Sequence, residues 1–312
     1  MGMAPSSASN AAWPVDGWPA LPIAEWQATR DTLHMWTQIV GKIRLKLAAL
    51  VNHWWEVPLY VTARGLTTSP IPYDGGVFEI QFDFIEHRLL IETSAGPTQT
   101  IHLGPRSVAD FYEEVMAALH AVGIVVKIWT MPVEVPDPIH FEQDRVHASY
   151  DAAYVNRFWR VLVSADTIFK EFRGRFIGKS SPVHFFWGSF DLAVTRFSGR
   201  RAPERPGADA ITREAYSHEV ISGGFWPGTG ETDAVFYCYA APEPQGFAKQ
   251  LILPSAAFYS SQLSEFLLKY EDVRTAASPR EAVLDFLQSA YEAGATLGNW
   301  DRESLERVPS KG

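Results

Sequence analysis

Two apolar stripes with the same spacing constrain the fold of this chain more than any other feature. Large apolar residues recur at intervals of 3, 4, 3, 4 and 3 positions in the first stripe: Leu33, Trp36, Val40, Ile43, Leu47 and Leu50. The same intervals return 122 positions later: Val155, Phe158, Leu162, Ala165, Phe169 and Phe172. Because this spacing places residues on one face of an α-helix, the sequence predicts two long helices in equivalent positions.

Segments with the pattern or composition of strands follow each predicted helix. After the first helix they cover residues 57–62, 77–83 and 87–93, and residues 124–130 have a similar composition. After the second helix they cover residues 183–192, 217–221, 234–240, 250–253 and 266–270. Residues 183–192 also align with residues 57–66, at a displacement of 126. Since period-two alternation is typical of half-buried strands, each series predicts an antiparallel meander.

A capped helix closes each series of strands. Ser107 is the expected N-cap of a helix that Gly123 ends, and Ser278 with Glu281 forms a capping box for a helix that ends near Gly294. The order helix, meander, helix therefore occurs twice. The predicted fold class is α+β, with two tandem, diverged helix/antiparallel-meander/helix units packed as one globular protein.

At 312 residues the chain is longer than a single hydrophobic core usually grows, which also favours two units. Residues 1–22, rich in Ala, Ser and Pro, are expected to form a flexible arm that Trp13 and Trp18 dock. The first unit is expected over residues 23–130 and the second, with the functional site, over residues 148–312. Residues 131–147 are the predicted linker, because three prolines fall within residues 131–138.

Overall composition excludes several classes of protein. The formal net charge of −9 argues against nucleic acid as a partner, because binding to a phosphate backbone requires a cationic surface. The single cysteine, Cys238, lies in an apolar run, so we expect a buried, inert thiol and a reducing compartment. The sequence shows neither a signal peptide nor a membrane span, so we expect a cytoplasmic protein without a membrane partner. Oligomeric state is not indicated.

One segment departs from the acidic average. Residues 170–205 hold eight cations against three anions, Glu171, Asp191 and Glu204. The cations are Lys170, Arg173, Arg175, Lys179, Arg196, Arg200, Arg201 and Arg205. Arginine side chains bind carboxylates and phosphates with two parallel hydrogen bonds, so Arg196, Arg200 and Arg201, with Lys179, predict a site for a small anionic ligand. The alternative is that these arginines pair with acidic residues of the other unit.

Histidines near this segment suggest acid/base chemistry. His184 lies in an aromatic strand and His218 with Glu219 opens another, so an antiparallel sheet can bring them together as catalytic residues. A histidine beside a carboxylate exchanges protons near neutral pH. The alternative is that His184 is a hydrogen-bonded core residue. Trp187 and Trp226, the latter in a glycine-rich loop, are expected to wall the pocket.

A metal site is a further hypothesis. His140, Asp144, His147 and Asp151 are spaced by 4, 3 and 4 positions, which places them on one face of a helix if Asp137 caps it. Imidazoles and carboxylates on one face can bind a divalent cation. The alternative is a solvated helix face with side-chain pairs four residues apart. No other cofactor is indicated by the sequence.

Two long segments carry a resemblance. Residues 172–203 (FRGRFIGKSSPVHFFWGSFDLAVTRFSGRRAP) and 216–228 (YSHEVISGGFWPG) resemble an uncharacterised bacterial domain-of-unknown-function family, and the similarity extends from about Trp26 to Glu306. The resemblance implies a bacterial, intracellular protein. It implies no reaction and no site residues.

Three functions are consistent with these features. The first is an enzyme in which His184, His218 and Glu219 perform acid/base chemistry on a small anionic metabolite. The second is a non-catalytic module that binds a small ligand in the same cleft, and the third is a scaffold protein. The geometry discriminates between the first two, because the enzyme requires these three side chains to meet. The first unit is expected to lack the site, since Pro58 and Gly65 align with His184 and Asp191.

Overall fold

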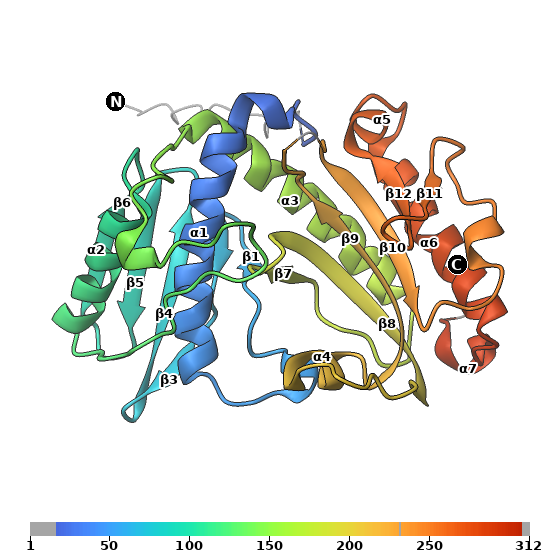
Figure 1. The fold of residues 1–312 in the computed structure, drawn as a ribbon, viewed down its shortest axis with the longest axis horizontal. Helices are drawn as coiled ribbons and strands as arrows, with labels where there is room; N and C mark the ends of the chain where they lie inside the picture. Colours follow the sequence, from blue (N-terminus) through green and yellow to red (C-terminus); the bar gives the residue numbers. More distant parts are fainter. Residues whose placement is uncertain (1–16, 231, 308–312) are drawn as a thin grey trace, which may run out of the picture.

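The protein contains two antiparallel sheets and seven α-helices in the part of the chain that the structure describes, residues 17–230 and 232–307 (Figure 1). The structure is a computed structural model. The predicted α+β class is confirmed. Residues 1–16 of the predicted arm, with Trp13, lie outside the described residues. Trp18 packs against the rings of Phe236 and Tyr270.

The first sheet follows a long helix. This helix, α1 (Ile23–Leu47), lies in front of the sheet in Figure 1, and α2 (Val108–Ala121) follows the last strand. The strands are β1 (Tyr60–Val61), β2 (Gly65–Thr67), β3 (Ile71–Tyr73), β4 (Gly76–Asp83), β5 (Arg88–Thr93) and β6 (Thr98–His102). Their order is β1-β2-β4-β5-β6, and β3 pairs with β4. Phe78, Ile80 and Phe82 of β4 are all buried, because period two turns them to one face. Ser107 caps α2 as predicted.

The second sheet packs against two helices, α3 (Ala152–Gly174) and α6 (Pro279–Leu297). Its strands are β7 (His184–Phe186), β8 (Asp191–Arg201), β9 (His218–Trp226), β10 (Val235–Ala241), β11 (Phe258–Ser260) and β12 (Glu265–Lys269), in the order β7-β8-β9-β10-β12-β11. Three short helices complete this part: α4 (Ala210–Ala215), α5 (Tyr270–Arg274) and α7 (Arg302–Leu305). Ser278 caps α6, which continues beyond Gly294 to Leu297. In Figure 1 both packing helices lie behind the sheet, so its front is free of long helices.

The two sheets meet at one backbone bridge. The amide of Leu59 donates to the carbonyl oxygen of Phe185 at 2.9 Å, and the amide of Phe185 donates to that of Leu59 at 2.9 Å. Leu59 and Phe185 occupy equivalent positions in the alignment of residues 57–66 with residues 183–192, which are displaced by 126. Contact between equivalent residues is what a two-fold relation between the units produces. Descent of both units from one ancestor stays a prediction.

Two predicted strands are absent from the described chain. Residues 124–130 alternate between buried and exposed, but the amide of Val125 donates to the hydroxyl of Tyr73 instead of a neighbouring strand. Residues 250–253 follow a 3-10 turn, Phe247–Lys249, and the amide of Leu253 donates to the hydroxyl of Ser289 in α6. Apolar composition alone was therefore insufficient, because a strand also needs its backbone to pair with a neighbouring strand.

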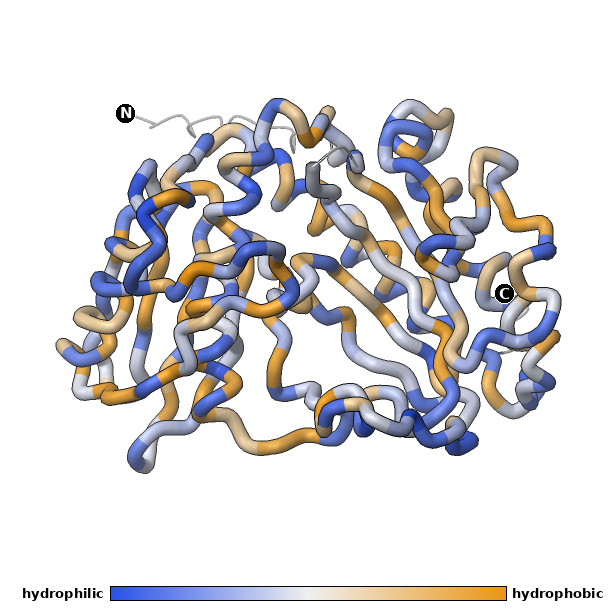
Figure 2. The backbone as a smooth tube through the Cα atoms, viewed as in Figure 1, coloured by the Kyte–Doolittle hydropathy of each residue, from blue (hydrophilic) through white to orange (hydrophobic). Residues whose placement is uncertain are grey.

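The segment between the end of β8 and α4 is more hydrophilic than the strands and helices of the core. Hydrophilic residues gather between the end of β8 and α4, at the lower right of Figure 2.

Among the described helices, none has both the length and the apolar character that a bilayer span requires. Two further 3-10 turns, Asn52–Trp54 and Phe141–Gln143, lie in the loops after α1 and α2.

Gly41 provides a test of how α1 packs against the second unit. A Cβ atom at Gly41 would overlap the indole ring of Trp187. Gly41→Ala is therefore expected to lower the free energy of unfolding by about 1–3 kcal/mol through overpacking. In an unobstructed helix the same change raises it by up to about 1 kcal/mol. Urea denaturation followed by circular dichroism measures the difference.

Gly174→Ala is the matched control, because a Cβ at this last residue of α3 meets no atom within 4 Å. We expect it to leave the free energy of unfolding unchanged or to increase it. A Gly41→Ala protein as stable as the Gly174→Ala protein would contradict the contact between α1 and Trp187.

Candidate functional site

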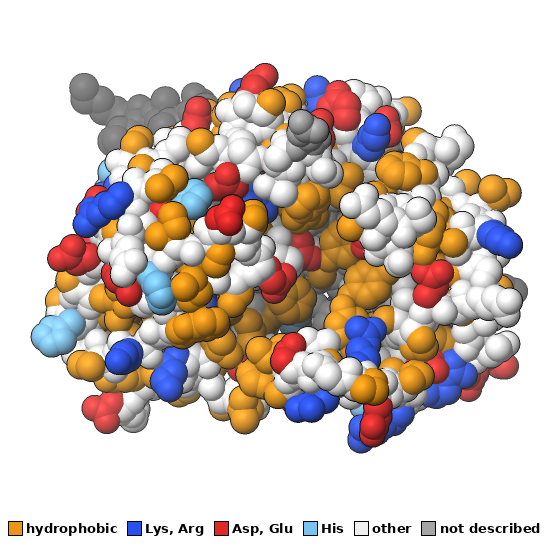
Figure 3. All heavy atoms as spheres, viewed as in Figure 1, with side chains coloured by type: hydrophobic (Ala, Val, Ile, Leu, Met, Phe, Trp, Pro, Cys, Tyr) orange, Lys and Arg blue, Asp and Glu red, His pale blue; other side chains and the backbone are white. Residues whose placement is uncertain are grey.

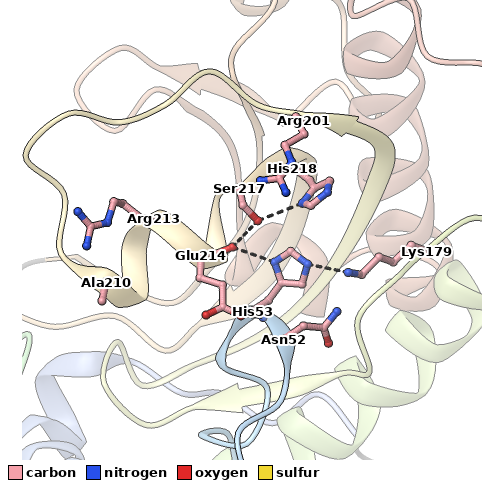
Figure 4. A pocket seen from close by; sticks show the side chains of 9 residues that line it. All are labelled: Asn52, His53, Lys179, Arg201, Ala210, Arg213, Glu214, Ser217 and His218. Atoms are coloured by element: carbon pink, nitrogen blue, oxygen red, sulfur yellow. Dashed lines mark hydrogen bonds between the residues drawn. The ribbon is translucent and has the colours of Figure 1, made fainter.

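An open pocket of about 470 Å³ lies where the loop after α1 meets the β8–β9 region (Figure 4). The 3-10 turn Asn52–Trp54 forms one side, and α4 with the ends of β8 and β9 forms the other. Its lining residues are Asn52, His53, Lys179, Arg201, Ala210, Arg213, Glu214, Ser217 and His218. We call it the basic pocket, since three of these side chains are lysine or arginine and one is a carboxylate.

His53 is held by three hydrogen bonds in a backbone conformation with φ 61°. Its amide donates to Oε1 of Glu214 at 3.1 Å, and its Nδ1 lies 3.0 Å from the carbonyl oxygen of Glu214. Nζ of Lys179 lies 2.7 Å from Nε2 of His53. An ammonium group only donates, so Nε2 of His53 accepts and Nδ1 carries the hydrogen that is donated to Glu214.

His218 is oriented through the same carbonyl oxygen. The hydroxyl of Ser217 donates to the carbonyl oxygen of Glu214 at 2.7 Å, so it accepts from Nδ1 of His218 at 3.0 Å. In the neutral ring this assignment leaves Nε2 of His218 as an acceptor, and no described residue donates to it. Figure 4 shows both histidines joined through Glu214 and Ser217.

The electrostatic environment keeps both imidazoles neutral. Burial lowers the pKa of His53 from its usual 6.5, and the charge of Lys179 lowers it further. Burial also lowers the pKa of His218, with further contributions from Lys179 and from Arg201, its cross-strand neighbour on β8. Each ring is therefore a hydrogen-bond acceptor at Nε2 near neutral pH.

The three cations of the basic pocket have no carboxylate partner. Lys179, Arg201 and Arg213 form no ion pair within the described residues, although most other arginines do. The ammonium of Lys179 lies over the rings of Trp55 at 5.3 Å and Phe197 at 5.1 Å. Lysine and arginine side chains also gather at the lower edge of the face in Figure 3, over α4 and the end of β8. The basic pocket therefore carries an excess of positive charge.

The structure brings together three of the residues that the sequence nominated: Lys179, Arg201 and His218. It adds Asn52, His53, Arg213, Glu214 and Ser217, which sequence analysis missed. His53 lies 126 positions from Lys179 and belongs to the first unit, so no local pattern pointed to it. Arg213 and Glu214 follow the basic segment by a few residues, and extending that segment would have included them.

Two nominated arginines have other partners. Arg196 is 1% exposed, and its guanidinium lies over the rings of Phe172 at 3.5 Å and Tyr291 at 4.2 Å. Arg200 pairs with Glu219 at 2.6 Å and donates to the carbonyl oxygen of Asn299, just after α6. Both lie outside the basic pocket, and within the described residues neither forms the pair with an acidic residue of the first unit that the alternative predicted.

The three nominated catalytic residues do not meet. His184 is 1% exposed among the rings of Trp55, Tyr60 and Phe186, and neither ring nitrogen has a partner in the described structure. Glu219 accepts hydrogen bonds from Ser198 and Arg200, and His218 lies in the basic pocket. This separation favours a binding function over the predicted catalytic group.

The two nominated tryptophans lie elsewhere. Trp187 packs on Gly41 of α1, and its Nε1 donates to the carbonyl oxygen of Val57 at 2.8 Å. Trp226 ends β9, opposite Val235. Neither lines the basic pocket, whose aromatic contacts come from Trp55 and Phe197 through Lys179.

The prediction of a helix that carries a metal site is wrong. Between Asp137 and Asp151 only Phe141–Gln143 is helical, as a 3-10 turn, so His140, Asp144, His147 and Asp151 do not share a helix face. Asp144 accepts from the amides of Val146 and His147 and from the His147 ring at 2.7 Å. Asp151 caps α3. Across the described residues, no group of three or more His, Cys, Asp or Glu is arranged to hold a metal ion.

A second group of titratable residues lies on the second sheet and in the loop beside it. Tyr237 and Ser189 donate hydrogen bonds to the carboxylate of Asp191, whose pKa burial raises. Burial and the charge of Asp191 raise the pKa of Glu265 to about 7 and also raise that of Glu134. Since Asp191 is satisfied by internal donors, we treat this group as part of the packing of the sheet.

The fold and the basic pocket define an α+β protein with a cleft lined by one lysine and two arginines. The chain belongs to a family of unknown function (DUF5996), whose model matches residues 18–307. This match confirms the resemblance to a family of unknown function. No curated protein and no solved structure matches the chain.

The burial of His184 predicts how the free energy of unfolding depends on pH. Its pKa is lowered to about 3 by burial and by the charges of Arg44 and Arg173, whereas an unfolded histidine titrates near 6.5. The unfolded chain therefore binds the proton first, and stability falls as pH drops from about 6.5 towards 3. This group alone is expected to cost about 2 kcal/mol between pH 7 and pH 5.

His184→Phe removes the titrating group and keeps an aromatic ring among aromatic neighbours. We expect the variant to lose about 2 kcal/mol less than the parent between pH 7 and pH 5 in urea denaturation. His34, whose pKa is also lowered to about 3, remains in both proteins and cancels in the comparison. Parallel pH profiles for the two proteins would show that His184 is not held neutral.

Proposed function

We propose that this protein binds a small anionic ligand in the basic pocket. The observation that supports the proposal is the unpaired state of Lys179, Arg201 and Arg213 around a cavity of about 470 Å³, in a chain of net charge −9. A fixed cluster of like charges costs free energy unless an anion offsets it. Guanidinium groups hold carboxylates and phosphates through paired hydrogen bonds.

The neutral groups of the pocket narrow the class of ligand. Nε2 of His218 is an acceptor beside Arg201, so it can accept a hydrogen bond from a hydroxyl or amine group of the ligand. The amide of Asn52 supplies a donor and an acceptor on the other side. A carboxylate or phosphate that also carries a hydrogen-bond donor satisfies the pocket best. A cytoplasmic location and the exclusion of nucleic acid remain expectations from composition.

Proton transfer by His218 is the second candidate function. A neutral imidazole whose Nδ1 is fixed by Ser217 and whose Nε2 faces a cavity has the arrangement of a general base. This candidate replaces the predicted trio of His184, His218 and Glu219 with one histidine. Exchange of a ligand C–H hydrogen with D₂O that the wild type catalyses and His218→Asn does not would favour it.

Removing one pocket arginine tests the binding proposal. Arg201→Ala and Arg213→Ala are each expected to weaken the binding of inorganic phosphate or L-lactate at least about tenfold, because a charge-assisted hydrogen bond contributes about 1.5–3 kcal/mol. Isothermal titration calorimetry at fixed ionic strength measures the affinity.

Lys249→Ala serves as the control, since it removes an exposed cation outside the basic pocket and changes net charge equally. It is expected to bind both anions as the wild type does. Equal weakening by all three substitutions would assign the effect to net charge and refute a defined site. Failure of the wild type to bind phosphate, L-lactate, pyruvate and pyridoxal 5′-phosphate would refute the proposal itself.

A further inference from the structure

Lys179 has surroundings unlike those of a lysine that only attracts an anion. Its Nζ donates to Nε2 of His53 at 2.7 Å and lies over the rings of Trp55 at 5.3 Å and Phe197 at 5.1 Å. Its backbone is fixed, because its carbonyl oxygen accepts from the amide of Phe197 at 3.0 Å and Ser180 forms a bridge with Arg196 on β8. The amine is therefore held against a proton acceptor, with aromatic rings beside it.

We propose that Lys179 is a nucleophile that forms an imine with the carbonyl carbon of an anionic carbonyl compound, either an oxo acid or a phosphorylated aldehyde. This inference rests on the proposed function, because the basic pocket must first bind the anionic group. A lysine amine, an adjacent base and a group that orients the base form the constellation of amine catalysis. Here these groups are Lys179, His53 and the carbonyl oxygen of Glu214.

Nucleophilic attack requires the neutral form of the Lys179 amine. Lys179 is exposed and its Nζ lies over two aromatic rings, while Arg201 and Arg213 add like charge to the same pocket. Partial desolvation lowers the pKa of Lys179 from its usual 10.5. His53 is neutral for the same reason and can accept the proton at Nε2.

The reaction balances with the groups present. The ammonium of Lys179 gives one proton to Nε2 of His53, and the free amine attacks the carbonyl carbon, so an N–C bond forms and the C=O π electrons move to oxygen. The oxygen takes one proton from the attacking nitrogen and a second proton from His53, and it leaves as water. The lone pair of nitrogen then forms the C=N bond. The sum is R–NH₃⁺ + O=C → R–NH⁺=C + H₂O.

The arrangement of the other cations suggests how the substrate lies. Figure 4 shows Lys179 and Arg201 on either side of His218, and Arg213 at the far end of the pocket beyond Glu214. An anionic group bound by Arg201 therefore leaves a neighbouring carbonyl group near Lys179. Nε2 of His218 lies between these two side chains, where it can accept a hydrogen bond from the substrate.

Reductive trapping tests the inference. The full-length protein is incubated with pyruvate or with pyridoxal 5′-phosphate, each with sodium cyanoborohydride, and adducts are located by intact mass and peptide mapping. We expect one adduct, at Lys179, formed at least about tenfold faster than at any other lysine, because among the described lysines only Lys179 is hydrogen-bonded to a histidine. L-Lactate, which lacks a carbonyl group beside its carboxylate, should bind without forming an adduct.

Three variants isolate the role of each group. Lys179→Arg keeps the positive charge but cannot form an imine, so it should form no adduct at this position. His53→Asn tolerates the positive φ and removes the base, and it should slow trapping about 100-fold. Lys170→Arg, at a lysine paired with Asp166 outside the basic pocket, should trap as the wild type does.

The outcomes separate this inference from the proposed function. If calorimetry shows that pyruvate and pyridoxal 5′-phosphate bind but trapping labels Lys179 no faster than the other lysines, the imine is refuted and anion binding stands. If none of the anions binds, the proposed function fails and the inference fails with it. Unchanged trapping in His53→Asn would refute the role of His53 as the base.

Discussion

The carbonyl oxygen of Glu214 is the acceptor on which the arrangement of the basic pocket depends. It accepts a hydrogen bond from Nδ1 of His53 and another from the hydroxyl of Ser217, which in turn accepts from Nδ1 of His218. Through these bonds one backbone atom sets the tautomers of both rings and turns both Nε2 atoms into acceptors. It also joins the loop after α1 to α4, so neither unit builds the pocket alone.

The packing between the units explains why the loop after α1 lies where it can line the basic pocket. The Leu59–Phe185 bridge joins the sheets, and Trp187 lies against Gly41, so the end of α1 is held beside the second sheet. Arg196 contributes to the interior, over the rings of Phe172 and Tyr291. Burying a guanidinium costs free energy unless aromatic faces and carbonyl groups compensate it. Lys179, Arg201 and Arg213, which form no ion pair within the described residues, have the cavity of the basic pocket beside them.

Features encoded in neighbouring residues were predicted well from the sequence. Both long helices and the caps Ser107 and Ser278 follow from periodicity and from side chains that bond to amides three residues on. Lys179 and Arg201 were found because their charges cluster locally. His53 was missed, because its partners lie 126 and 161 positions away and become neighbours only in the folded chain. The spacing of Asp144 and Asp151 suggested one helix face, but the carboxylate of Asp144 caps a turn and that of Asp151 caps α3.

Crystals grown with selenate test the central claim most directly, because anomalous scattering locates the anion without prior assumptions. The basic pocket predicts an anomalous peak within hydrogen-bond distance of at least two of Lys179, Arg201 and Arg213, at a position free of lattice contacts. Peaks confined to other surface cations, with the basic pocket empty at high selenate concentration, would contradict it.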